Sequence, residues 1–245
     1  MKEINLALLG FGTVGSGVAV TIRENSRIIE EQLGCKLVIK HVLVRNINKY
    51  KNNNLLKGIH LTDSFNDIIE DQSLDIIIEV MGGISPAKEY IFSALKKHIS
   101  VVSANKDLVS LHGPEIIHMA IEKHVNFSCE ASVGGGIPIL MPLHQSLATN
   151  RIDSIVGILN GTTNYILTQM METGQSYDEA LKEAQAEGFA EADPTNDVCG
   201  FDAARQLAIL SSIGFRANVT FEDVIVEGIT KISPNDIKYA KEMGY

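Results

Sequence analysis

Acidic and amide side chains gather in the stretch AEGFAEADPTNDVCGFDAARQ, residues 186–206. Its last part is predicted to be a helix in which Asp202 and Gln206, four residues apart, project from one face. A buried acidic face suits a polar substrate, which is what this arrangement predicts. A structural interpretation stands beside it, in which Asp197 caps a helix and Asp202 pairs with Arg205 on the surface.

A glycine motif near the N-terminus predicts a nucleotide site. The sequence GFGTVG, residues 10–15, follows an apolar segment and precedes residues at helical spacing. Glycines in this pattern permit a tight turn, close approach of the backbone to a pyrophosphate, and close packing of helix on strand. The alternative is a glycine turn without a ligand. We therefore expect dinucleotide binding by the whole motif, that is by Gly10, Phe11, Gly12, Thr13, Val14 and Gly15.

Basic residues follow the second predicted strand, KLVIKHVLV. An Asp or Glu at its end would accept hydrogen bonds from the adenosine ribose, but the sequence has Arg45 there and Lys49 shortly after. Cations at this point suit a 2'-phosphate, which favours NADP over NAD, with NAD as the alternative. A solvated basic loop would give the same pattern.

Lys106 ends the segment VSANK, which follows another predicted strand. Ligands bind at the carboxyl ends of strands in open parallel sheets, so Lys106 is a candidate site residue. The alternative is a surface lysine whose stem packs on apolar neighbours.

Two further segments combine turns with polar groups. Residues 130–138, EASVGGGIP, place flexible backbone beside the carboxylate of Glu130, and carbonyl oxygens presented in this way could bind a hard cation. An interdomain hinge would explain them equally well. Residues 157–165, GILNGTTNY, combine a strand end with a helix N-cap, so their amides and hydroxyls could line a polar pocket. Capping alone would also require them.

The elements that would position these residues alternate between strand and helix. Short apolar segments separated by helical patterns favour a parallel, doubly wound sheet. The expected strands are 4–9, 37–44, 75–80, 99–103 and 125–129; the expected helices are 65–70, 87–97 and 114–123, besides one after the glycine motif. After residue 138 the pattern changes to a helix over 139–148, a strand over 152–159 and several helices.

Composition excludes several classes of protein. With 245 residues, 45% of them hydrophobic, the chain can bury a large core in one or two domains. The net charge of -9 argues against general binding of nucleic acid or anionic membranes. The apolar run near the N-terminus is too short to span a membrane, so we expect a cytoplasmic protein.

The three cysteines, Cys35, Cys129 and Cys199, are widely spaced and form no CxxC pair, so we expect them to be reduced. Cys129 lies near a glycine turn and could be a nucleophile. Its apolar surroundings, VNFSCEA, favour a buried small hydrophobe instead.

Five motifs, taken in order along the chain, resemble the homoserine dehydrogenase family over nearly the whole sequence: GFGTVGSGV, SANKDL, EASVGGGIPI, GILNGTTNYIL and AEADPTNDVCGFDAAR. The resemblance implies an oxidoreductase that interconverts L-homoserine and L-aspartate 4-semialdehyde with NAD(P)(H), in the route to threonine, methionine and isoleucine. It also implies a homodimer, with a Rossmann nucleotide domain over residues 1–135 and an α+β substrate and dimerisation domain over 136–245.

The resemblance implies roles for individual residues. The glycine motif would bind the pyrophosphate and Arg45 the adenosine end, while Lys106 would lie near the nicotinamide and the reacting oxygen. In the substrate pocket Glu191 and Asp202 would hold the homoserine amino group, with Gly188 approaching by its backbone and Thr163 lining the pocket. The segment headed by Glu130 would bind sodium or another monovalent cation, through the carbonyls of Val133, Gly135 and Ile137.

Two departures from the family pattern matter. The family has a lysine, proposed as proton donor, where this chain has Gln206; a carboxamide donates a hydrogen bond but supplies no proton. General acid catalysis typically contributes about 10²- to 10⁴-fold, and Lys106 could take over the role. The family's catalytic region also continues past the segment matching Ile232–Pro234, whereas this sequence stops at Tyr245, so we expect an incomplete second domain with uncovered apolar faces or sheet edges.

Two other functions therefore stand beside the dehydrogenase. One is a catalytically weak homologue that binds nucleotide and amino acid, because of Gln206. The other is a related nicotinamide enzyme that acts on a different amino acid.

Overall fold

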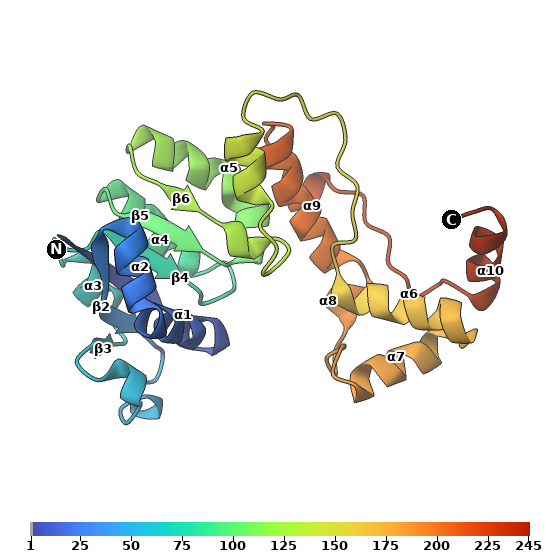
Figure 1. The fold of residues 1–245 in the computed structure, drawn as a ribbon, viewed down its shortest axis with the longest axis horizontal. Coiled ribbons are helices and arrows are strands. Elements are labelled where there is room, and N and C mark those ends of the chain that lie inside the picture. The colour runs from blue at the N-terminus through green and yellow to red at the C-terminus, as the bar shows by residue number, and fades with distance from the viewer. Residues whose placement is uncertain (1) are drawn as a thin grey trace. The chain divides into compact units, whose positions relative to one another are not determined.

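The computed structural model describes residues 2–245, and the chain divides into two compact units. The first ends at Met141 and the second covers Pro142–Tyr245. The sequence-based division lay between residues 135 and 136. Figure 1 shows the helices and strands of each unit. None of the helices within residues 2–245 combines the length and apolar character that a membrane crossing needs.

The first unit is built on a six-stranded sheet with the order β3-β2-β1-β4-β5-β6, in which every neighbouring pair is parallel. This confirms the predicted doubly wound α/β fold. The short strand β3 was not expected, because three residues carry too little periodicity to be recognised. The strands are β1 (Lys2–Leu9), β2 (Cys35–Leu43), β3 (His60–Thr62), β4 (Ile76–Glu79), β5 (Ser100–Ser103) and β6 (Phe127–Ser128).

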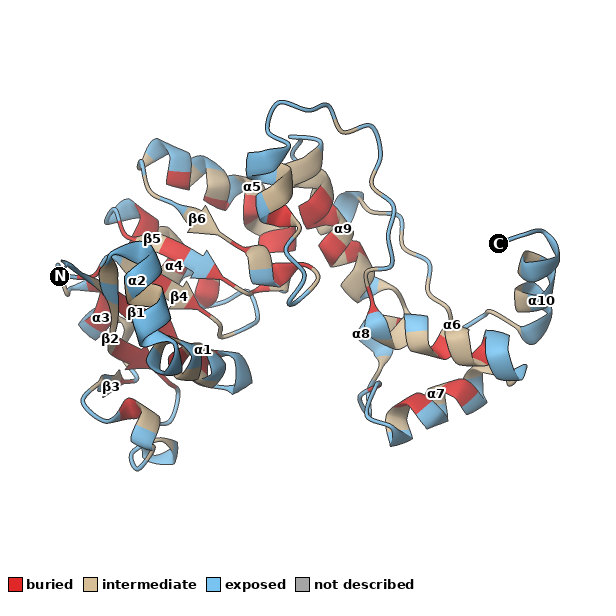
Figure 2. Ribbon diagram, viewed as in Figure 1, coloured by how far each residue is buried: buried red, intermediate tan, exposed pale blue. Residues whose placement is uncertain are grey.

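Residues 6–9, the second half of the central strand β1, are buried on both faces of the sheet, which explains why all four are apolar. Successive side chains of a strand point to opposite faces. Ala7 and Leu9 belong to the core cluster that includes Ile91 of α4, while Leu8 belongs to a second cluster with Ala19 of α1. Figure 2 shows this burial along the strands and on the inner sides of the helices.

Five α-helices accompany the sheet: α1 (Thr13–Glu24), α2 (Ser26–Leu33), α3 (Phe65–Ile69), α4 (Ala87–Lys96) and α5 (Lys106–Glu122). Short helical turns are η1 (Ile47–Lys49), η2 (Asn54–Leu56) and η3 (Glu130–Ser132). The helix expected to begin at Pro114 begins eight residues earlier, at Lys106, and Pro114 lies inside it. Proline favours the first helical position, which suggested a start there, but Asn105 supplies the actual N-cap by accepting a hydrogen bond from Leu108 N at 3.1 Å.

The glycine turn between β1 and α1 requires glycine at two positions. Gly10 has φ +103°, a conformation that side chains disfavour, and a Cβ there would lie 2.9 Å from Val80 O. A Cβ on Gly15 would lie 2.2 Å from Gly10 O. Helix, turn and strand therefore pack backbone against backbone.

The second unit consists of helices and extended segments. Its helices are α6 (Gly161–Thr173), α7 (Tyr177–Ala186), α8 (Thr195–Val198), α9 (Phe201–Gly214) and α10 (Pro234–Glu242), with the short η4 (Pro142–Ser146) and η5 (Phe221–Asp223). Its core includes Ile166, Met170, Ala180 and Ala184. Reciprocal capping boxes begin α7 and α10, with Ser176 paired to Glu179 and Ser233 to Asp236.

Two elements expected at the start of this unit differ from the structure. The helix expected over 139–148 is reduced to a π-helical turn over Pro142–Ser146. The strand expected over 152–159 does not form, since none of residues 142–245 belongs to a sheet. Its apolar sequence suits a strand, but a strand needs a hydrogen-bonded neighbour. Val156 is consequently 95% exposed and Ile158 78% exposed.

Candidate active site

The carboxyl edge of the sheet brings together the glycine turn and Lys106. Gly10 follows β1 and Lys106 begins α5 just after β5, while β4 lies between these two strands. The connections run to opposite sides from β1, whose neighbours are β2 and β4. This is the point where parallel sheets of this kind bind ligands.

The glycine turn is packed on its inner side and open on its outer side. Phe11 is buried, and its ring meets Tyr50 edge to face with 5.7 Å between centroids. A Cβ on Gly12 would meet nothing within 4 Å, and Thr13 is exposed. Val14 is 53% exposed as well. The outer surface of the turn is thus accessible to a phosphate at the N-terminus of α1.

The two candidate cations for a 2'-phosphate lie just past β2. Arg45 is exposed two residues beyond the end of the strand. Lys49 ends η1 and places its Nζ 5.3 Å from the ring centre of Tyr50, the residue that packs on Phe11. Lys49 is therefore linked to the glycine turn through Tyr50, which contacts Phe11.

A buried carboxylate that sequence reasoning missed supports the turn before Lys106. Glu79, the last residue of β4, is 0% exposed. Its Oε2 accepts a hydrogen bond from Ser103 Oγ at 2.7 Å, and its Oε1 accepts bonds from Met81 N at 2.8 Å and Asn105 Nδ2 at 3.4 Å. An acidic residue closing the apolar strand IIIE was the available signal.

Glu130 caps a helical turn with its side chain. Its carboxylate accepts hydrogen bonds from Ile139 N at 2.6 Å, Leu140 N at 3.0 Å and Met141 N at 2.7 Å. These bonds anchor the last residues of the first unit to η3.

In residues 129–137 the backbone carbonyls of Cys129, Glu130 and Gly134 accept hydrogen bonds from backbone amides of the same segment. Within residues 2–245, no group of three or more His, Cys, Asp or Glu side chains could hold a metal ion. A cation in this segment would accordingly rest on backbone carbonyls, as those of Val133, Gly135 and Ile137 would provide.

Asp202 and Gln206 meet on one face of α9. Gln206 is buried, and its Nε2 donates to Asp202 Oδ2 at 2.7 Å and to Leu159 O at 2.8 Å. Asn160 Nδ2 donates to the same Asp202 oxygen at 3.0 Å. Two side-chain amides thus orient the carboxylate.

A second carboxylate, which the sequence analysis treated only as a possible cap, joins this cluster. Asp197 accepts hydrogen bonds from Asn160 Nδ2 at 2.8 Å and from Thr162 Oγ1 at 2.9 Å. Asn160 also caps α6, because its Oδ1 accepts a hydrogen bond from Thr163 N at 2.8 Å. The signal for Asn160 was its place before a predicted helix, whereas the bonds to Asp197 span 37 residues and leave no local pattern.

The remaining substrate candidates are placed differently. Thr163 lies in the cluster, with its Oγ1 3.0 Å from Asn160 Oδ1. Gly188 follows α7 with φ +79°, and Glu191 is exposed. The structure gathers Asn160, Thr163, Asp202 and Gln206.

One further carboxyl and one thiol have shifted pKa values. Asp193 accepts hydrogen bonds from Thr195, which hold the pKa of that carboxyl below its usual range. Cys129 is buried, and burial raises the pKa of its thiol to about 11. A thiol that stays protonated at neutral pH packs as a small hydrophobe, the interpretation that its sequence favours.

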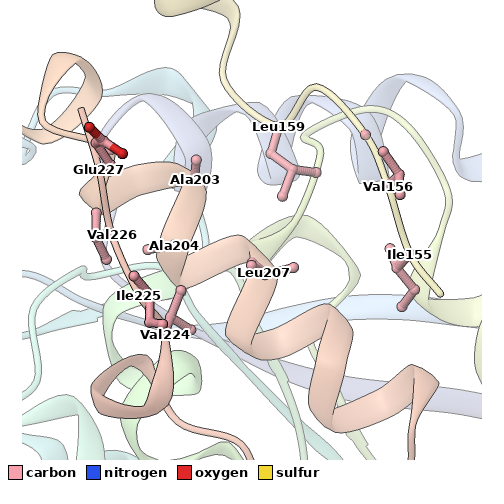
Figure 3. A pocket seen from close by; sticks show the side chains of 12 residues that line it. Ile155, Val156, Leu159, Ala203, Ala204, Leu207, Val224, Ile225, Val226 and Glu227 are labelled. Atoms are coloured by element: carbon pink, nitrogen blue, oxygen red, sulfur yellow. The ribbon is translucent and has the colours of Figure 1, made fainter. Parts of the chain in front are cut away.

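An apolar groove of about 360 Å³ lies on another face of α9 (Figure 3). Its floor is lined by Ala203, which follows Asp202, and by Leu207, which follows Gln206. Val156 and Ile225 lie along its sides. Glu227 is the only charged residue among those lining it. This lining suits apolar groups, whereas the face of α9 that carries Asp202 and Gln206 is polar.

Comparison with known proteins matches both units. A family model described as homoserine dehydrogenase, NAD binding domain, matches residues 10–130, and one described as homoserine dehydrogenase matches residues 138–245. A homoserine dehydrogenase of Bacillus subtilis is 48% identical over all 245 residues. The chain spans 56% of the length of that relative.

Solved structures agree with the sequence matches. A homoserine dehydrogenase from Thiobacillus denitrificans superposes with a TM-score of 0.91 at 43% identity, covering 100% of this chain and 56% of the other. A hyperthermophilic archaeal homoserine dehydrogenase in complex with NADPH superposes with a TM-score of 0.78 at 27% identity, covering 95% of this chain and 76% of the other.

Proposed function

The chain belongs to the homoserine dehydrogenase family, and on that premise we propose that it interconverts L-homoserine and L-aspartate 4-semialdehyde, using NADP(H). The observation that carries the proposal is the polar face of α9. Two amides hold the Asp202 carboxylate in a fixed orientation, and a fixed carboxylate is what a substrate ammonium requires.

The proposed cofactor follows from the carboxyl edge of the sheet. The turn over residues 10–15 offers backbone amides and a helix N-terminus to the pyrophosphate. Arg45 and Lys49 supply positive charge for a 2'-phosphate, which favours NADP(H) over NAD(H). The archaeal structural relative was solved in complex with NADPH.

The reaction divides between cofactor and protein. Bound NADP(H) supplies the hydride acceptor or donor. Asp202 and Glu191 would hold the substrate ammonium, and Gly188 and Thr163 would line its pocket. Lys106 would take the proton from the alcohol oxygen in oxidation and return it in reduction, because Gln206 lacks a proton to give.

The segment that begins at Glu130 has a structural role in this proposal. Val133, Gly135 and Ile137 would present carbonyl oxygens to sodium or another monovalent cation, while the Glu130 carboxylate keeps capping residues 139–141. We also infer a cytoplasmic homodimer, as the family resemblance implies.

The experiment that tests the proposal measures NADPH formation that depends on L-homoserine at alkaline pH. Alkaline conditions favour oxidation, because the reaction releases a proton. Turnover with homoserine and little with simple alcohols supports the proposal, since the Asp202 face selects an ammonium. A sample that binds NADP and homoserine but shows no turnover would overturn it.

A catalytically weak binding protein is the less favoured function, given 48% identity to a named homoserine dehydrogenase along the whole chain. The observation behind it is that Gln206 binds Asp202 and Leu159 O through its amide. Replacing Gln206 by lysine separates the two functions, as described below.

A further inference from the structure

Glu79 is a fully buried carboxylate for which the proposed reaction has no direct use. Its hydrogen-bond partners within residues 2–245 are the neutral donors Ser103, Met81 and Asn105. Burying a carboxylate costs several kcal/mol unless hydrogen bonds compensate. An apolar residue would suit the core position better on packing grounds alone, so the carboxylate calls for another explanation.

The bonds of Glu79 converge on the turn between β5 and α5. Glu79 pairs with Ser103 across the two parallel strands. Ser103 Oγ donates to Glu79 and accepts from Asn105 N at 3.0 Å, while Asn105 Nδ2 reaches Glu79 Oε1 directly. Both carboxylate oxygens therefore support residues 103–105.

This turn fixes the backbone of Lys106 from both sides. Asn105 caps the helix through Leu108 N, and its Nδ2 donates to Gly83 O at 2.6 Å. Lys106 N donates to Ala104 O at 3.1 Å. The first residue of α5 is thus held by a network whose centre is the Glu79 carboxylate.

The same carboxylate reaches the loop that borders the glycine turn. Met81 N donates to Glu79 Oε1. The preceding residue, Val80, packs closely on Gly10, because a Cβ on Gly10 would lie only 2.9 Å from the Val80 carbonyl oxygen. Glu79 consequently links the loop after β4, the turn after β5 and, through Val80, the backbone of the nucleotide turn.

All three partners donate to Glu79, so both oxygens of its carboxylate act as acceptors. A glutamine in its place keeps one carbonyl oxygen for Met81 and Asn105 but turns an amide group toward Ser103. An alanine leaves all three donors without an acceptor. The two substitutions therefore remove graded amounts of the same support.

We propose that Glu79 is a positioning residue for Lys106: its carboxylate holds the 103–105 turn, and so sets the place from which the Lys106 side chain reaches the substrate oxygen. This inference rests on the proposed function, because it assigns Lys106 the proton transfer. Misplacement of a catalytic group by about 1 Å can cost on the order of 10²-fold in rate.

The first test is a double-mutant cycle on kcat for homoserine oxidation. We expect Glu79→Gln to lower kcat by about 30-fold and leave the KM for NADP within about twofold, and Glu79→Ala to lower kcat further. In a Lys106→Ala background, Glu79→Gln should change kcat less than about twofold, since nothing is left to position. An equal fold loss in both backgrounds would show a general structural role and overturn the proposal.

Ser110→Ala is the matched control. Ser110 is buried in the first turns of α5 and bonds Asp107 O at 3.0 Å without touching Glu79. We expect this variant to lower the melting temperature by an amount similar to Glu79→Gln while keeping kcat. Equal losses of kcat in the two variants would again count against positioning.

A second measurement does not depend on turnover. Acetylation of the protein with an N-hydroxysuccinimide ester, followed by peptide mass spectrometry, gives the rate at Lys106 relative to the exposed Lys96 on α4. Glu79→Gln should change this ratio by at least about threefold, because reactivity depends on placement. An unchanged ratio would overturn the positioning role, whereas absent turnover in the unmodified protein would count only against the proposed reaction.

Discussion

Two carboxylates, one in each unit, accept hydrogen bonds from neutral donors, but the arrangement of these donors differs. Glu79 is fully buried, and one of its three donors is a backbone amide. Asp202 is only partly buried, and the side-chain amides of Asn160 and Gln206 both donate to its Oδ2.

The difference shows which part of a site tolerates sequence change. At Glu79 the donors belong to the loop after β4 and the turn after β5, whose paths the sheet fixes, so a substitution there disturbs backbone. At Asp202 both of these donors are side chains, and a lysine at position 206 could donate to the same oxygen as the glutamine. Residue 206 can therefore change its proton chemistry while it keeps its hydrogen bond.

The largest effect expected is that of Lys106→Ala, which tests whether the edge of the sheet carries the proton chemistry. We expect kcat for homoserine oxidation to fall by about 10³-fold, within the range of general acid-base catalysis. NADP affinity, measured by titration of protein fluorescence, should change little. A loss of less than tenfold would move the proton transfer away from Lys106.

Asp202→Asn tests whether the second carboxylate binds charge. The substitution retains the shape but removes the negative charge, and a charge-assisted hydrogen bond contributes about 1.5–3 kcal/mol. We expect the KM for homoserine to rise by about 30-fold, with the KM for NADP unchanged. An unchanged homoserine KM would leave Asp202 as a purely structural partner of Asn160.

Gln206→Lys tests directly whether a lysine can replace the glutamine as the hydrogen-bond donor to Asp202. A lysine here adds a second proton donor while keeping a bond to Asp202, so we expect kcat to rise by about tenfold. The steady-state rate of NADPH formation measures it, with Gln206→Met as the control for size. A gain of more than about 10²-fold would mean that the glutamine had disabled the enzyme, and would favour the weak-homologue function.

Cys129 extends the comparison to a buried thiol, because no oppositely charged neighbour within residues 2–245 offsets the effect of burial on its pKa. Its pKa of about 11 in the folded protein exceeds the ordinary value of 9.0, so its contribution to stability is complete below pH 9 and is lost as the pH rises to 11. We expect a loss of about 0.8 kcal/mol at pH 9.5 relative to pH 7. Urea unfolding of the protein and of Cys129→Ala at both pH values measures it; an equal pH dependence in both would contradict the assignment.

The sequence was sufficient where a local pattern carries the structure. The apolar end of β1, the glycine spacing at residues 10–15 and the alternation of apolar segments with helical patterns all reflect neighbours along the chain, and that alternation predicted the doubly wound sheet. The approximate places of β4 and β5 were predicted in the same way.

What the sequence could not supply were contacts between distant residues. The bond from Glu79 to Ser103 spans 24 residues, and that from Asn160 to Asp202 spans 42. The expected strand over 152–159 failed for a related reason, since a strand exists only where another chain segment pairs with it. At Pro114 a strong local preference pointed to a helix start, but capping by Asn105 and the network behind it moved the start to Lys106.

The interlocked glycines limit how this protein can evolve. At Gly15 the atom that a Cβ would strike is the carbonyl of Gly10, and at Gly10 it is the carbonyl of Val80. Both obstacles are backbone atoms, so trimming a neighbouring side chain creates no room. A suppressor screen that starts from Gly15→Ala should accordingly return revertants to glycine, because no single side-chain change elsewhere reopens that space.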